Sequence, residues 1–200
     1  SSQASGNATA QAFDIYNGII ENVDVDAEGA VYTPGANNGS GTIGLIRGGS
    51  IDDLKVSIPV GKEVNGLSVG ANSGVPVDLR DIEMTAPHGI ASSPEASPTP
   101  VTNTGKRLVI HSPDPFDVND GFFKLSDSVL DASMAPPSTD PYALGQAADV
   151  ADGRPPNPAG LTMDRVTLVG NGQATSTAFI LAGQGSPQAT FLEARHIVTS

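Results

Sequence analysis

The sequence predicts an all-β solenoid, in which short parallel strands from successive coils stack along one axis. Three observations lead to this prediction. A six-residue motif recurs along the chain, polar and apolar residues alternate in its last three positions, and Gly and Pro interrupt every long window. The alternation is typical of a half-buried strand, while scattered Gly and Pro disfavour long helices. We therefore expect a single domain over residues 1–200, or a fragment of a longer solenoid.

The recurring motif has an apolar residue, two polar residues, a small or apolar residue, a variable residue and a final apolar residue. Its six copies begin at Ile20, Ile51, Leu79, Leu125, Met163 and Leu192. Three of the five intervals lie near 30 residues, a spacing found in repeat architectures. The polar pair often ends in Asn or Asp, which suit tight bends. Each copy is therefore expected to be a bend that leads into a strand. The last copy is the weakest, because its better alignment places Arg195 inward.

A second apolar stretch precedes most copies of the motif, so one coil would hold two short strands and their turns. These stretches are residues 12–16, 42–46, 64–69, 107–110 and 178–182. The two longest intervals between copies contain Pro-rich segments at about residues 86–105 and 131–160, which we interpret as loop inserts. A β-sandwich is the alternative architecture, because it also consists of short strands separated by turns.

The core must be built mainly from aliphatic side chains. Leu, Ile, Val and Phe account for 47 of the 200 residues, aromatic residues make up 4 %, and Trp is absent. One strand pair cannot bury its apolar face alone, whereas stacked coils line a continuous core. This composition therefore suits a solenoid better than a compact globule.

The motif copies resemble coils of the right-handed parallel β-helix proteins, the pectin-lyase-like superfamily. The segments 125–131 and 161–170 are typical of its generic members. The resemblance covers roughly residues 12–200 and implies a right-handed parallel β-helix of about five to six coils. The superfamily includes polysaccharide lyases and hydrolases, phage tailspikes, and bacterial surface or autotransporter passenger domains. The chain looks like a surface or passenger member, although the fold alone does not select among these functions.

Four residues form the candidate catalytic set for a polysaccharide-active enzyme: Asp52, Asp53, Arg80 and His88. Pectin-degrading hydrolases of this fold carry an Asp-Asp pair followed by Gly-His-Gly and Arg-x-Lys, and paired carboxylates can cleave a glycosidic bond. Here Pro87 precedes the histidine, and no Arg-x-Lys triplet occurs. The Asp pair also fills the motif position that other polar pairs fill elsewhere. We interpret it as a repeat-position bend and expect no catalytic residues.

Asp24, Asp26 and Glu28 match the front half of a calcium loop, in which oxygen ligands alternate before a Gly. The twelfth position of that loop would be Gly35, which offers no side-chain ligand. The same residues continue a strand whose carboxylates would point to solvent. Calcium is therefore only a weak candidate, and no cofactor is expected.

The charge of the chain excludes several classes of partner. Ten Lys and Arg against 22 Asp and Glu give a formal charge of −12, and the isoelectric point is about 4.3. Nucleic-acid affinity comes mostly from basic side chains that displace counterions, so no nucleic acid is expected.

No apolar run approaches the roughly 18 residues that span a bilayer, so no membrane insertion is expected. Cysteine is absent, which excludes disulfide scaffolds and thiolate sites.

These observations favour a non-enzymatic, extracellular or cell-surface domain with a structural or adhesive role, as part of a surface protein or filament. The alternative is a polysaccharide lyase or hydrolase, or the carbohydrate-binding shaft of a phage tailspike. Carbohydrates or cell-surface ligands are the expected partners. The repeat runs to both ends of the sequence, and residue 1 is Ser, so we expect a processed or partial chain. Uncapped coils expose strand edges, which predicts further coils or end-to-end self-association.

Overall fold

The computed structural model describes residues 12–26, 41–58, 64–70, 74–93, 101–118, 121–135, 148–150, 159–170, 179–181 and 191–199. Every regular element in these ranges is a β-strand, and no helix there is long and apolar enough to cross a membrane. The strands are β1 (Phe13–Asp26), β2 (Gly41–Ser57), β3 (Val64–Gly70), β4 (Val77–Thr85), β5 (His88–Ser93), β6 (Thr102–His111), β7 (Phe116–Val118), β8 (Gly121–Asp131), β9 (Ala148–Val150), β10 (Ala159–Val169), β11 (Phe179–Leu181), β12 (Phe191–Arg195) and β13 (Val198–Thr199).

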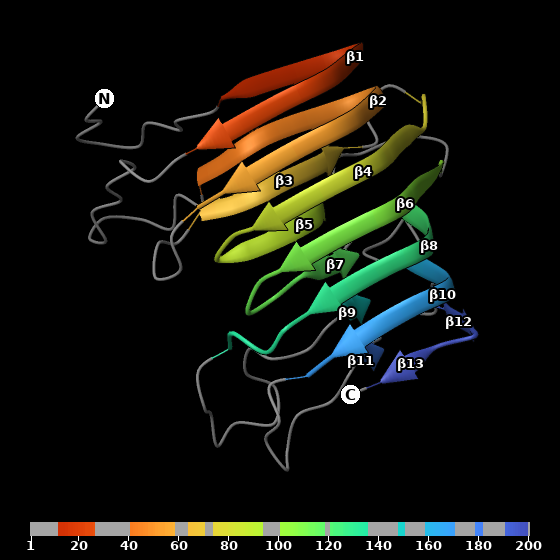
Figure 1. Ribbon diagram of the computed structural model, residues 1–200. Coiled ribbons are helices and arrows are strands. Elements are labelled where there is room, and N and C mark those ends of the chain that lie inside the picture. The colour runs from red at the N-terminus through yellow and green to blue at the C-terminus, as the bar shows by residue number, and fades with distance from the viewer. Residues whose placement is uncertain are drawn as a thin grey trace, which may run out of the picture.

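The strands form one parallel sheet with two arms that meet at β2. The first half of β2 pairs with β3, and its second half pairs with β4. From there, the motif arm runs through β4, β6, β8, β10 and β12, and the second arm through β3, β5, β7, β9 and β11. The chain visits the two arms alternately, and Figure 1 shows the motif arm in front of the second arm. All pairings between the described strands are parallel, which does not agree with a sandwich of antiparallel strands.

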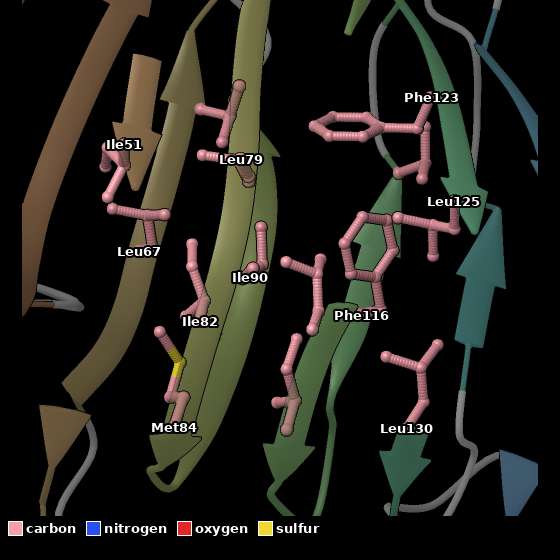
Figure 2. Packing of buried hydrophobic residues seen from close by; sticks show 14 of the residues in the cluster. Ile51, Leu67, Leu79, Ile82, Met84, Ile90, Phe116, Phe123, Leu125 and Leu130 are labelled. Carbon is pink, nitrogen blue, oxygen red and sulfur yellow. The ribbon is translucent and has the colours of Figure 1, made fainter. Parts of the chain in front are cut away.

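The sheet is curled, so that its two arms enclose the core. The rings of Phe116 in β7 and Phe123 in β8 meet edge to face across the arms, with centroids 5.1 Å apart. In Figure 2, side chains from both arms point into the same space. Ile51 and Leu79 from the motif arm and Leu67 from the second arm are fully buried. The predicted aliphatic core is therefore confirmed over the described residues, with two phenylalanines among its largest members.

The predicted second strands are found largely where the apolar stretches place them. Residues 12–16, 42–46, 64–69 and 178–182 overlap β1, β2, β3 and β11. The stretch 107–110 is different, because it lies in β6 within the motif arm.

β6 is a row of the motif arm that the repeat analysis missed. Gly105 pairs with Leu79 of β4 on one side and with Leu125 of β8 on the other. The 46-residue interval between those two motif copies therefore contains one more strand of the same arm, and the motif arm has more rows than the six copies predicted.

The alignment of the last copy was wrong by two residues. Met163 of β10 pairs with Ala194, so the copy begins at Ala194 and not at Leu192. Arg195 therefore faces outward, with 69 % of its side chain exposed. An inward arginine would have placed an unpaired charge in an apolar core.

The predicted inserts are shorter than proposed where the structure describes them. Residues 88–93 and 102–105 of the first insert lie in β5 and β6, and Ile90 is part of the core. In the second insert, residues 148–150 form β9, and its ends belong to β8 and β10. Residues 86–87, 101 and 132–135 are described but lie outside the strands, and residues 94–100, 136–147 and 151–158 lie outside the described residues.

Candidate functional site

The motif arm bends at one position in every row. The residue there has a left-handed backbone with φ between 50° and 56°, while the residues on either side stay in parallel register with the next row. We name these residues the bend ladder; they are Asn22, Asp53, Asp81, Arg107, Asp127, Arg165 and His196. Asn and Asp are the non-glycine residues that best tolerate this conformation, which explains the Asn or Asp at the end of the polar pair. The predicted bend is therefore confirmed.

Arginines of the bend ladder bind the aspartates of the row before them. Arg107 donates from Nε and Nη2 to the two carboxylate oxygens of Asp81, with 2.5 Å between Nε and Oδ1. Arg165 contacts Asp127 in the same way, at 2.5 Å from Nε and 3.1 Å from Nη2. Two parallel hydrogen bonds between a guanidinium and a carboxylate fix both partners in orientation. These contacts therefore tie neighbouring rows together in register.

The bend ladder continues toward the C-terminal end of the sheet through Asp164. This residue precedes Arg165 and receives a hydrogen bond from its Nη1. On its other side, Asp164 Oδ1 lies 2.8 Å from Nδ1 of His196 in the following row. One carboxylate thus joins two members of the ladder.

The ion pairs shift the titration of their carboxylates. Hydrogen bonds from Arg107 hold the pKa of Asp81 below the usual value of 3.8, and hydrogen bonds from Arg165 do the same for the pKa of Asp127. The contact with His196 lowers the pKa of Asp164. Asp81 and Asp127 raise the pKa of Arg107 and Arg165, respectively. The aspartates and arginines of these pairs are charged at neutral pH, so the sign of the charge alternates along the ladder from Asp81 to Arg165.

A buried serine of β8, Ser128, forms hydrogen bonds with backbone groups of β6 and β8 beside their bends. The Ser128 hydroxyl accepts a hydrogen bond from the backbone N–H of Leu108 at 3.0 Å and donates to the carbonyl of Ser126 at 2.7 Å. The side chain thereby satisfies backbone groups at the left-handed bend, where a buried unpaired N–H would be costly. Ser128 thus replaces the apolar residue that fills the equivalent position in other rows.

The structure brings together three of the four predicted catalytic residues. Asp52 and Arg80 are register partners on adjacent strands, and Asp53 is a member of the bend ladder with φ 56°. Arg80 pairs with Asp78, which also accepts a hydrogen bond from Thr104 at 2.6 Å. These contacts lie on the exposed outer face of the sheet.

His88 is not part of that group. It begins β5 on the second arm, where its Nδ1 lies 3.4 Å from Asp114 Oδ2. His111 makes a similar contact, with Nδ1 2.9 Å from Asp131 Oδ2. Burial raises the pKa of Asp131, but hydrogen bonds from Ser133 and His111 outweigh it and lower that pKa overall. Each of the three histidines therefore lies against an aspartate, a pattern that the sequence analysis missed.

The calcium candidates are only partly described. Asp24 and Asp26 are exposed residues of β1, and Glu28 lies outside the described residues. Within the described ranges, no three His, Cys, Asp or Glu side chains form a group that could hold a metal ion.

The outer face of the motif arm can therefore hold strands in register and present ordered charges and hydroxyls. Comparison of the chain with protein-family models, with curated proteins and with solved structures finds no match. The residue geometry alone supports the functional argument that follows.

Proposed function

We propose that this chain is a right-handed parallel β-helix that serves as a non-enzymatic structural or adhesive domain at a cell surface or outside the cell. The helical winding is supported by the alternation of the chain between the two arms, since each return to one arm advances by one parallel strand. A crossover between parallel strands of one sheet is almost always right-handed, which supports the hand.

The bend ladder is the observation that carries the functional part of the proposal. Its arginines bind aspartates of neighbouring rows, as Arg107 binds Asp81 and Arg165 binds Asp127. Charges used in this way hold a long parallel sheet in register. An outer face of this kind suits a rigid stalk or an adhesive surface, and carbohydrates or cell-surface molecules are its proposed ligands.

The functional experiment measures product release and binding side by side. The full chain is incubated with a panel of neutral and acidic polysaccharides, and reducing ends and unsaturated products are measured. The same polysaccharides are immobilised to measure binding. We expect binding to part of the panel without product. Product release that disappears in both Asp52→Asn and Asp53→Asn would overturn the non-enzymatic proposal.

The stacking of adjacent rows can be tested by cross-linking, because the chain has no cysteine. Lys55 and Glu83 are exposed register partners on β2 and β4, so Lys55→Cys with Glu83→Cys should form a disulfide. The matched control is Lys55→Cys with Val109→Cys, because Val109 is the partner of Glu83 one row further on. Cross-linking of the control pair as readily as the register pair would contradict the stacked arrangement.

A further inference from the structure

The two ends of the described sheet expose opposite strand edges. β1 pairs with β2 along its length, and no other described strand pairs with it. At the other end, β12 and β13 pair with β10 and with no further described strand. Figure 1 shows β1 and β12–β13 at opposite ends of the stack. An unpaired strand edge is a template for another strand.

The apolar side chains of the strands at both edges are only partly buried. Ile20 and Val23 of β1 are partly buried, whereas Ile51 and Leu54 at the same positions of β2 are completely buried. At the opposite end, Ile197 is also only partly buried. Both edges would gain apolar burial from a further row of the same kind.

The two edges have matching backbone shapes. β1 bends at Asn22 with φ 55°, and the C-terminal edge bends at His196 with φ 51°. Inside the sheet, each left-handed bend stacks on the bend of the next row. If a copy continues this register, Ala194 lies next to Ile20, and Ile197 lies next to Val23. A straight strand could pair with a bent edge strand on only one side of the bend.

The charges of the two edges are complementary in that same register. β1 carries Asp14, Glu21, Asp24 and Asp26 and has no Lys or Arg. The C-terminal edge presents Arg195, which forms an ion pair with Glu193 of the same strand and which the register places opposite Glu21. Two β1 edges would instead bring carboxylates together, and like charges across an interface disfavour that pairing.

We propose that these edges form one joint, in which β1 of one copy adds to β12–β13 of a second copy in parallel, with Glu21 beside Arg195. This inference rests on the proposed β-helix and gives it a polarity and a partner, a second copy of this chain. A joint between two different surfaces does not close on itself when the rotation between copies is small, so copies add in an open series.

The first experiment measures the mass of the full chain by sedimentation velocity from micromolar to millimolar concentration. We expect a concentration-dependent series of oligomers. Glu21→Gln should raise the association Kd about 10-fold. The matched control Asp24→Asn removes one carboxylate from the same strand, but the register places Asp24 opposite Val198, so its Kd should change little. Combining Glu21→Arg with Arg195→Glu should restore association that each single reversal weakens.

The second experiment tests the geometry of the joint with introduced cysteines. A chain with Glu21→Cys mixed with a chain with Arg195→Cys should form a disulfide-linked heterodimer under mild oxidation. Asp26→Cys replaces Glu21→Cys in the control, because Asp26 lies five residues further along β1 and should not link to Arg195→Cys. Equal linking of both pairs would overturn the proposed register.

Three results would overturn the joint: a monomer at every concentration, a closed dimer linked through β1 alone, or β1 amides protected from exchange in a monomer. The last result would mean that another part of the same chain covers β1. None of them affects the absence of product release or the Lys55–Glu83 cross-link, so failure of the joint is distinguishable from failure of the proposed function.

Discussion

The edge strand β1 and its neighbour β2 carry the same motif, but only β2 buries the first two apolar side chains of the motif completely. Ile51 and Leu54 of β2 have no exposed surface, whereas Ile20 and Val23 of β1 are partly buried at the same positions. The difference does not come from residue type, since Ile occupies the first position in both strands. A row buries its apolar side chains only when rows lie on both sides of it, which is the energetic basis of a stacked repeat.

The largest expected effect comes from truncating an apolar side chain in a covered row. Leu79→Ala should lower the free energy of unfolding by about 3 kcal/mol, because Leu79 is completely buried between β2 and β6. Ile20→Ala on the edge should lower it by only about 1 kcal/mol, since part of that side chain is already in water. Urea denaturation measures both values. Equal losses would mean that β1 is covered as well as β4 is.

The attachment of the edge strand depends on a close approach of two backbones. A Cβ on Gly49 of β2 would lie 1.9 Å from the carbonyl oxygen of Gly18 of β1, and φ of Gly49 is +104°. Gly49→Ala should therefore destabilise the protein by about 2–3 kcal/mol and speed amide exchange in β1. The control is Gly74→Ala, which also has a positive φ but no atom within 4 Å of the added carbon. The idea fails if exchange in β1 is equally fast in the two variants.

A third comparison concerns the left-handed bend itself. Asp53 has φ 56°, which a β-branched side chain adopts only with strain. Asp53→Ile should destabilise the fold by about 1–2 kcal/mol. Asp53→Asn should have almost no effect, because Asn accepts the same backbone conformation. Both values come from chemical denaturation, and an Ile variant as stable as the Asn variant would mean that the bend relaxes when its residue changes.

The sequence predicted the bend correctly because its chemistry is local, but it did not reveal every row. β6 was missed because Gly105 has no side chain at the apolar position. A Cβ there would lie 2.6 Å from Leu125 and 2.8 Å from Leu108, so neighbouring leucines fill the space. The last copy was misplaced because small Ala194 gives little apolar signal at the first position. In the β6 row, the burial at the first motif position comes from neighbouring leucines, whereas Ala194 in the last row is exposed.

The ion pairs of the bend ladder could not be predicted, because they depend on register between distant segments. Arg107 and Asp81 are 26 residues apart, whereas Arg165 and Asp127 are 38 apart. No fixed sequence spacing therefore identifies them. Strand register also decided which of the candidate catalytic residues lie together. It brings Asp52 next to Arg80, whereas His88 begins a strand of the other arm.

The smallest expected effect is the acid response of two ladder aspartates, Asp81 and Asp127, and of two aspartates outside the ladder, Asp131 and Asp164. The pKa values of Asp81, Asp127, Asp131 and Asp164 are lower in the folded protein than the usual 3.8 of a free aspartate. These carboxylates therefore stabilise the fold fully above about pH 4, and the stabilisation is lost as pH falls through the lower folded values. The melting temperature should be nearly flat from pH 7 to about pH 4 and should then fall.

A variant without two of the ladder carboxylates identifies the groups responsible for the fall in melting temperature. Asp81→Asn combined with Asp127→Asn removes two ladder carboxylates, while Asn keeps the left-handed bend acceptable. Its melting temperature should be slightly lower at pH 7 and should decrease less steeply below pH 4. High salt should reduce the difference between the two proteins, because exposed ion pairs are screened. Identical slopes for the variant and the parent below pH 4 would assign the acid response to carboxylates outside the ladder.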